Sequence, residues 1–187
     1  MFKFYKMKIT QLRILFVLLT SIPMLSQSQN ESGKISNYKP RIINTTDLGA
    51  DPDDEQSMVR QLVSANEFDI EGLIVSSGCW KKSQNNTDML DRLIDAYAEA
   101  YPNLKQHAEG YPTPEYLRSI SVMGQDEYGM ADVGEGQDSS GSELIIKSVD
   151  KDNPRPVWVM GWGGMNTAAR ALWKVKQTRT AEELEKF

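Results

Sequence analysis

The chain has 187 residues, of which 40% are hydrophobic, a formal net charge of −5 and a single cysteine, Cys79. The negative charge argues against nucleic-acid binding, which depends on neutralising phosphates with Lys and Arg. One cysteine allows no internal disulfide. The length is enough to bury one hydrophobic core, so we expect one domain after any leader segment.

Residues 1–28 have the three-part layout of a secretory signal peptide. Four basic residues precede an apolar stretch that begins at Ile14, and the small residues Ser26 and Ser28 offer a cleavage site. An uncleaved membrane anchor is the alternative, although the apolar run is short for a bilayer span. Cleavage would take the formal net charge from −5 to −9. It would leave a secreted or periplasmic protein without stable membrane association, and residues 29–40 would be a flexible lead-in.

An acidic loop follows the first predicted strand. The run from Ile42 to Thr46 is apolar and β-branched, which is typical of a buried strand. Residues 47–55 then contain four aspartates and one glutamate. A helix is expected from Asp53, because Asp is a favourable N-cap. The carboxylates would therefore lie at the carboxyl end of a strand, where open α/β sheets bind their ligands.

Carboxylates at this spacing repel one another, and a hard cation would relieve the repulsion. Ca²⁺ is the cation that such loops favour, because it takes about six to eight oxygen ligands. An acidic, solvated turn is the alternative, since the loop lacks the spacing of the EF-hand calcium loop. Both interpretations stay open on the residues alone.

A strand–helix–strand unit is predicted around this loop. Residues 55–65 have the periodicity of an amphipathic helix and residues 70–76 that of a second buried strand, so the two strands should be parallel. Ser77 and Trp80 follow the second strand and either line a pocket or form an ordinary turn. Cys79 is expected to be a small buried residue rather than a nucleophile, because no histidine lies near it in the sequence.

The middle of the chain combines two predicted helices with a long polar loop. Residues 87–101 form an amphipathic pattern that a proline ends, and residues 115–123 form a second helix. Residues 124–142 are rich in glycine, and loops of this length in a compact chain are usually functional or disordered. The aromatic and acidic side chains of this loop, including Tyr128 and Glu135, suit a sugar-like ligand. The alternative is that its glycines only make turns.

A second strand–turn–helix lies near the end of the chain. Residues 139–149 are predicted to form a capped helix, residues 156–161 a buried strand, and residues 168–176 a helix. The Gly-rich turn between the last two begins at Trp162. This turn either belongs to the ligand-binding edge or merely packs the helix close to the sheet.

Three of these segments resemble nucleoside hydrolases. The first strand and its loop are similar to the signature Asp-x-Asp-x-Gly-x-Asp-Asp, but Thr45 replaces the first Asp and two extra residues precede the Asp pair. These departures match the nucleoside-hydrolase-like branch that is often labelled cellulose-binding protein. The polar loop is similar to that branch's Gly-Gln-x-x-Tyr-Gly … Gly-Glu-Gly … Ser-Gly-Ser pattern. The late turn is similar to Gly-Pro-x-Thr-Asn-x-Ala, with Trp162 and Gly163 in place of the Gly-Pro pair.

The resemblance, which extends from about Arg41 to Leu172, implies a three-layer α/β fold with a mainly parallel, Rossmann-like sheet. Residues 41–187 would be the N-terminal part of such a domain, incomplete at its C-terminus. In the family, the C-terminal part supplies a further Asp ligand and often a His, and this sequence supplies neither at a matching place.

The resemblance also implies roles for individual residues. Calcium would be bound by Asp47, Asp54 and the backbone carbonyl of Met165, and Asp47 would accept a proton from a water held by the ion. Asp53 and Asn166 would contact sugar hydroxyls. The first hypothesis is therefore a hydrolase of N-glycosyl or related glycosyl bonds that uses a calcium-activated water.

Two other functions stay open. One is a secreted carbohydrate-binding protein without catalysis, in which Trp80, Tyr128 and Trp162 stack on sugar rings. The other is a remnant that has lost activity. The expected ligand is a small molecule or a carbohydrate, and the sequence leaves the substrate and the oligomeric state undefined.

Overall fold

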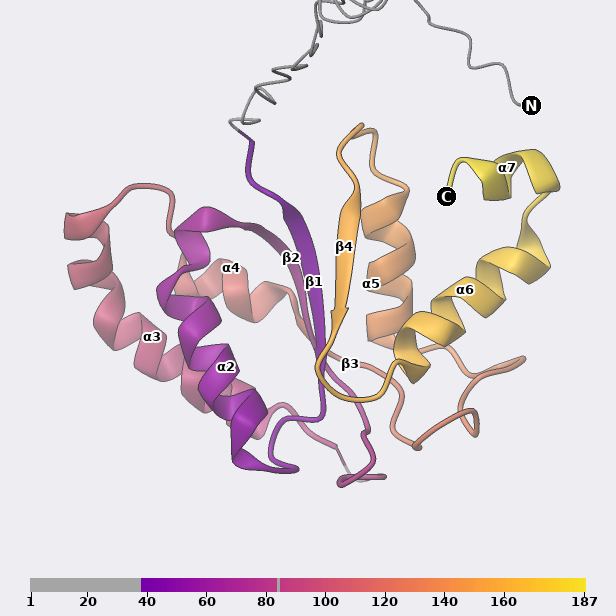
Figure 1. Cartoon of the computed structure of the whole chain (residues 1–187), viewed down its shortest axis with the longest axis horizontal. Coiled ribbons are helices and arrows are strands. Elements are labelled where there is room, and N and C mark those ends of the chain that lie inside the picture. The colour runs from indigo at the N-terminus through magenta and orange to yellow at the C-terminus, as the bar shows by residue number, and fades with distance from the viewer. Residues whose placement is uncertain (1–37, 84) are drawn as a thin grey trace, which may run out of the picture. The chain divides into compact units, whose positions relative to one another are not determined.

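The computed structural model describes residues 38–187 except residue 84 (Figure 1), so the predicted signal peptide and residues 29–37 lie outside the described residues. No helix in the described part is long and apolar enough to cross a membrane. The elements in chain order are β1 (Arg41–Thr46), α2 (Pro52–Val63), η1 (Ala65–Glu67), β2 (Asp69–Val75), α3 (Asp88–His107), α4 (Pro114–Ser119), β3 (Ser121–Met123), α5 (Ser140–Val149), β4 (Val157–Gly161), α6 (Asn166–Thr178) and α7 (Ala181–Glu185).

The four strands form a parallel sheet in the order β3-β2-β1-β4. Because all four run the same way, their carboxyl ends meet at one edge, the lower edge in Figure 1. The chain builds β2 and β3 on one side of β1 and then returns to place β4 on the other side. The reversal between β1 and β4 is the position at which open α/β sheets form their ligand crevice.

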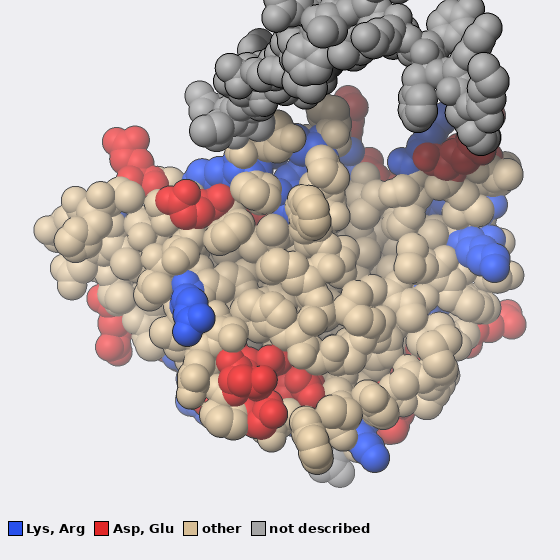
Figure 2. All heavy atoms as spheres, in the orientation of Figure 1, with Lys and Arg blue, Asp and Glu red and all other residues tan. Residues whose placement is uncertain are grey.

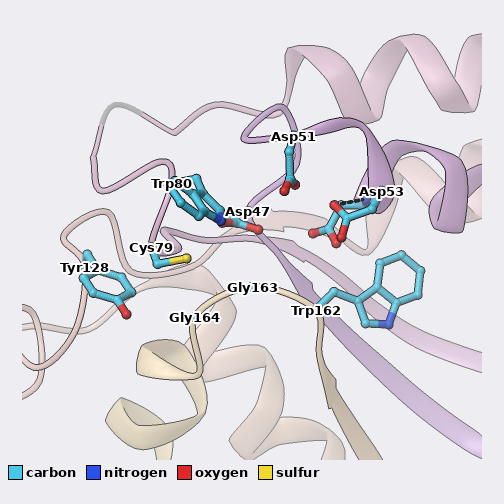
Figure 3. A pocket seen from close by; sticks show the side chains of 10 residues that line it. Asp47, Asp51, Asp53, Cys79, Trp80, Tyr128, Trp162, Gly163 and Gly164 are labelled. Carbon is cyan, nitrogen blue, oxygen red and sulfur yellow. Dashed lines mark hydrogen bonds between the residues drawn. The ribbon is translucent and has the colours of Figure 1, made fainter.

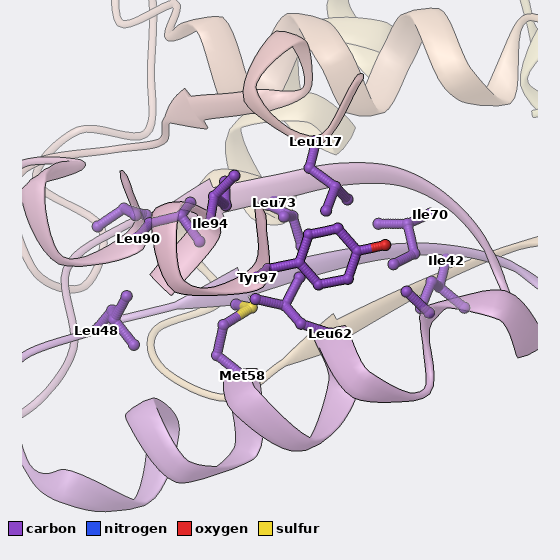
Figure 4. Close-up of a cluster of buried hydrophobic side chains, with 12 residues drawn as sticks. Ile42, Leu48, Met58, Leu62, Ile70, Leu73, Leu90, Ile94, Tyr97 and Leu117 are labelled. Atoms are coloured by element: carbon purple, nitrogen blue, oxygen red, sulfur yellow. The ribbon is translucent and has the colours of Figure 1, made fainter. Parts of the chain in front are cut away.

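Helices cover both faces of the sheet, which confirms the predicted three-layer α/β architecture (Figure 1). Successive residues of a strand point to opposite faces, so Ile42 and Ile43 of β1 belong to different hydrophobic cores. Helices α2, α3 and α4 pack on the face of Ile42, with Met58 and Ile94 among the buried side chains (Figure 4). Helices α5 and α6 pack on the face of Ile43 and Ile74.

The start of α2 differs from the sequence prediction. Asp51, not Asp53, is the N-cap, and Pro52 occupies the first helical position, where its missing N–H removes no helical hydrogen bond. Asp53 and Asp54 therefore belong to the first turn, where negative charge interacts favourably with the helix dipole. This earlier start directs the aspartates toward the carboxyl edge of the sheet.

Two predictions in the middle of the chain were wrong. Helix α3 continues through Pro102, which was expected to end it, because Leu104 beyond the proline still packs against the core. Residues 121–123 form a strand and are not the end of the helix predicted at 115–123. Their backbone pairs in parallel with β2, so Ser121 lies opposite Leu73. This long-range pairing decides the local structure.

Candidate functional site

A cavity of about 230 Å³ lies at the carboxyl edge of the sheet, between the segments that follow β1, β2 and β4 (Figure 3). It is lined by Asp47, Asp51, Asp53, Asp54, Cys79, Trp80, Tyr128, Trp162, Gly163 and Gly164. The structure therefore brings together most of the site residues that the sequence predicts. Cys79 was expected to be buried, but its side chain is exposed and lines the cavity.

Asp47 lies between two glycines that come from other segments. A Cβ atom at Gly78 would lie 1.6 Å from Asp47 Oδ2, and one at Gly163 would lie 2.7 Å from Asp47 Oδ1. Both distances are far inside van der Waals contact, so only glycine fits on either side of this carboxylate. Asp47 is 6% exposed. Burial, and then the nearby charge of Asp54, raise the pKa of the Asp47 carboxyl.

The other carboxylates come from the start of α2, where Figure 2 shows acidic side chains gathered on the surface. The Thr46 hydroxyl donates a hydrogen bond to the Asp54 carboxylate, and Asp53 accepts one from the backbone N–H of Asp54 at 2.8 Å. A hydrogen bond with Asp53, followed by desolvation and neighbouring negative charges, raises the pKa of Asp51 to about 6. The same hydrogen bond lowers the pKa of Asp53.

The charge of this cluster suits a hard cation. Among the described residues that line the cavity there is no Lys or Arg. The nearby ammonium of Lys81 donates to the backbone carbonyl of Leu48 at 3.2 Å. A divalent cation would balance the repulsion between the carboxylates. The ligand count is small, however. In residues 38–187 other than 84, no group of three or more His, Cys, Asp or Glu side chains is placed to hold a metal ion. Water or sugar hydroxyls would have to complete the coordination of an ion at Asp47 and Asp54.

Met165, the third predicted calcium ligand, does not line the cavity. Its carbonyl accepts the Ala169 N–H at 2.9 Å, in the first turn of α6. Its sulfur lies 3.8 Å from the hydroxyl of Thr45, the residue that replaces the first Asp of the signature. A carbonyl oxygen has a second lone pair, so one acceptor position of Met165 is still open.

Three aromatic residues border the carboxylates. Trp80 is 78% exposed and Tyr128 is 44% exposed, and both lie on the opposite side of Asp47 from Trp162 in Figure 3. The backbone N–H of Trp162 donates to Thr45 O at 2.8 Å and so continues the pairing of β4 with β1. Glu135 is exposed in the Gly-rich loop and does not line the cavity.

Asn166 lies behind the cavity rather than on its surface. It is 5% exposed, and its amide bonds to Ser76, to Ser77 and to the carbonyl of Glu127. Both serines are fully buried. Ser77, which was expected either to line a pocket or to belong to an ordinary turn, does not line the cavity and instead bonds to Asn166 behind it.

Sequence reasoning missed Gln125 and the two glycines beside Asp47. The side chain of Gln125 donates to the carbonyls of Asp132 and Gln137, both at 2.8 Å, and so holds the two ends of the Gly-rich loop together. Its signal in the sequence was the Gly-Gln pair that opens the loop. The glycines gave no comparable signal, because the contact with Asp47 joins segments that are far apart in the chain.

The parallel sheet, its order and the carboxylates at the β1–β4 reversal define a nucleoside-hydrolase-like α/β protein. Residues 41–187 match the family model described as "Cellulose-binding Sde182, nucleoside hydrolase-like domain", and the chain belongs to this family. The sequence-based resemblance is thus confirmed.

One solved structure is similar to the chain over most of its length. It is a nucleoside hydrolase-related hypothetical protein from Saccharophagus degradans that is associated with carbohydrate metabolism. The two are 63% identical with a TM-score of 0.78, and the match covers 80% of this chain and 36% of that chain. The chain therefore spans little more than a third of its solved relative. No curated protein matches the sequence.

Proposed function

We propose that the cavity binds a neutral carbohydrate. The observation that carries this proposal is the placement of Trp80, Tyr128 and Trp162 around a group of aspartates. Aromatic rings offer apolar faces to a sugar ring, and carboxylates accept hydrogen bonds from its hydroxyls. The lack of basic side chains among the described lining residues disfavours phosphorylated ligands and nucleic acid. The description of the family as cellulose-binding supports the same ligand class.

Binding of cellohexaose, measured by calorimetry, tests this proposal. Trp80→Ala should weaken binding about tenfold, because burial of an apolar indole face against a sugar ring, at about 25 cal/mol per Å², contributes on the order of 1.4 kcal/mol. Trp158→Ala is the matched control, since Trp158 is 62% exposed on β4 and does not line the cavity. Equal affinities in the wild type and both variants would contradict the proposal.

We propose hydrolysis of an N-glycosyl or related bond as a second function of the same site. The observation that favours it is Asp47, a nearly buried carboxylate on the wall of the cavity. A carboxylate placed beside a water molecule can accept its proton as a general base. Calcium bound at Asp47 and Asp54 would supply positive charge that lowers the pKa of a water molecule. Asp53 would accept hydrogen bonds from sugar hydroxyls.

Release of free sugar from nucleosides, with Ca²⁺ or with a chelator, tests the second function. Asp47→Asn keeps the size of the side chain and removes the base, so turnover should disappear, whereas Asp88→Asn on α3 should leave it unchanged. Sugar binding without turnover would restrict the function to carbohydrate binding. A protein that shows neither binding nor turnover would be an inactive remnant.

We also propose that the protein is exported. The signal-peptide pattern of residues 1–28 supports this, and a cellulose-binding family fits a secreted protein. N-terminal sequencing of exported protein should find a chain that starts near Gln29. An intact Met1 on a membrane-bound product would contradict it.

A further inference from the structure

The side chain of Asn166 uses its whole hydrogen-bonding capacity inside the protein. Its Oδ1 accepts from the Ser76 hydroxyl at 2.8 Å and from the Thr167 N–H at 3.1 Å. Its Nδ2 donates to Ser77 Oγ and to the Glu127 carbonyl, both at 2.7 Å. An amide side chain offers two lone pairs and two N–H groups, so no group is left for a ligand.

These partners belong to three different segments. Ser76 and Ser77 follow β2, Glu127 lies in the Gly-rich loop, and Thr167 is the second residue of α6. A single buried side chain therefore joins the three segments that meet behind the cavity. A network of this kind is favourable only when every member is bonded, since a buried polar group without a partner costs about 1–3 kcal/mol.

Two of the bonds lie next to the walls of the cavity. Glu127 precedes Tyr128, whose N–H donates to the Lys82 carbonyl at 2.9 Å and whose ring borders the cavity. The backbone carbonyl of Ser77 accepts a hydrogen bond from the Gly164 N–H at 3.1 Å. Ser77 also directly precedes Gly78, the glycine that packs on Asp47. Loss of the Asn166 amide would thus free the backbone next to Tyr128 on one side of the cavity and loosen the segment beside Asp47 on the other.

We propose that Asn166 is a positioning residue that fixes Tyr128 and the segment after β2 at the cavity, and that it does not contact the ligand. A direct contact with a sugar hydroxyl would require Asn166 to give up a bond to Ser77 or to Glu127. Only the ligand-binding part of the test below rests on the proposed carbohydrate binding.

Hydrogen exchange of the full chain without ligand gives the first test. Asn166→Asp keeps the size of the side chain and its acceptor bonds from Ser76 and Thr167, but it places a carboxylate oxygen against the Glu127 carbonyl. Exchange in residues 125–138 should accelerate about tenfold, as expected for the loss of one hydrogen bond to a buried group. The amides of β1 should be unchanged.

Asn153→Asp is the matched control, because Asn153 Oδ1 accepts a hydrogen bond from Arg155 N–H and the substitution keeps that acceptor. Ser77→Ala gives a second variant that removes one acceptor and leaves the Glu127 bond in place. If exchange in residues 125–138 does not change in Asn166→Asp, or if all segments accelerate equally, the positioning role is refuted.

A double-mutant cycle with cellohexaose gives the second test. If Asn166 acts by holding Tyr128, Asn166→Asp should weaken binding in the wild type but have little further effect in Tyr128→Ala. Losses that multiply fully would show that Asn166 does not act by holding Tyr128 and would overturn the proposal. If even the wild type does not bind cellohexaose, the proposed function fails, while the exchange experiment still decides the role of Asn166.

Discussion

The carboxylates that line the cavity and the amide network behind them satisfy their polar groups in opposite ways. The carboxylate wall, formed by Asp47, Asp51, Asp53 and Asp54, gathers negative charges, and no described lining residue carries a positive one. Behind the lining lies a second layer, here called the amide wall, whose side chains bond almost entirely to one another and to nearby backbone: Ser76, Ser77, Gln125, Asn166 and Thr167. Of its side-chain atoms only Gln125 Oε1 is buried without a partner.

If the cavity binds a ligand as proposed, this difference separates a preformed support from a ligand-binding surface. The bonds of the amide wall are made without any ligand, so it acts as a rigid support. In the carboxylate wall, burial raises the pKa of Asp47 and a hydrogen bond with Asp53 raises the pKa of Asp51, and neighbouring negative charges add to both shifts. A bound proton, a cation or the hydroxyls of a sugar would each stabilise these carboxylates.

The largest effect should come from disturbing the close packing of Gly78 against Asp47 of the carboxylate wall. Gly78→Ala would place a methyl group inside the Asp47 carboxylate, and the forced shift should lower the free energy of unfolding by about 1–3 kcal/mol. Gly134→Ala is the matched control, because nothing lies within 4 Å of the Cβ position at Gly134. Chemical denaturation measures both, and equal stabilities would show that Asp47 moves aside freely.

The second-largest effect should be on the affinity for Ca²⁺, which we expect to depend on the carboxylate wall and much less on the amide wall. We expect calorimetry to detect Ca²⁺ binding that Asp47→Asn and Asp54→Asn each weaken about tenfold or more, because ligand charge sets calcium affinity. Asn166→Asp, on the amide wall, should have a much smaller effect. The same affinity in the wild type and in both carboxylate variants would exclude a calcium site at the carboxylate wall.

The pH dependence of stability should reveal the crowded carboxylates. The folded pKa of Asp51, about 6, lies above its unfolded value of about 3.9. The contribution of its proton to stability is therefore fully present below about pH 4 and is lost as the pH rises through 6. The raised pKa of Asp47 acts in the same direction. The lowered pKa of Asp53 has the opposite effect: its contribution to stability is present above its unfolded pKa and is lost as the pH falls through its folded pKa.

In a chelating buffer, the melting temperature should consequently fall between pH 4 and pH 7. Asp51→Asn should flatten this fall, and Asp88→Asn should leave it unchanged. A melting temperature that rises over the same range in the wild type would show that the folded protein does not raise the pKa of Asp51 and Asp47.

The smallest effect on stability is expected at the rim. Trp80→Ala should change the free energy of unfolding by less than about 0.5 kcal/mol, because the side chain is 78% exposed, even though it weakens sugar binding. Thermal unfolding checks this. A larger loss would mean that Trp80 supports the wall and is not mainly a ligand surface.

Local patterns in the sequence were enough to predict much of the fold. The apolar runs at Ile42 and Leu73 became buried strands of one parallel sheet, because strand periodicity is visible over a few residues. The run at Val159 became a strand of the same sheet, but the prediction that it is buried was wrong, because β4 is partly exposed and Trp158 is 62% exposed. The capping serine at residue 139 was also confirmed, and it forms a capping box with Ser142. These features depend on neighbours in the chain.

The sequence by itself also determined that Asp47 follows the end of a strand and that Asp54 comes shortly after it, at the edge where an α/β sheet places its ligand. Only the tertiary structure decided that Gly78 and Gly163 enclose Asp47, that Asn166 bonds behind the cavity, and that Cys79 faces it. Those contacts join segments separated by dozens of residues, and a one-dimensional pattern does not record which distant backbone will approach a side chain. The carboxylate wall is thus visible in the sequence, whereas the amide wall exists only once the chain has folded.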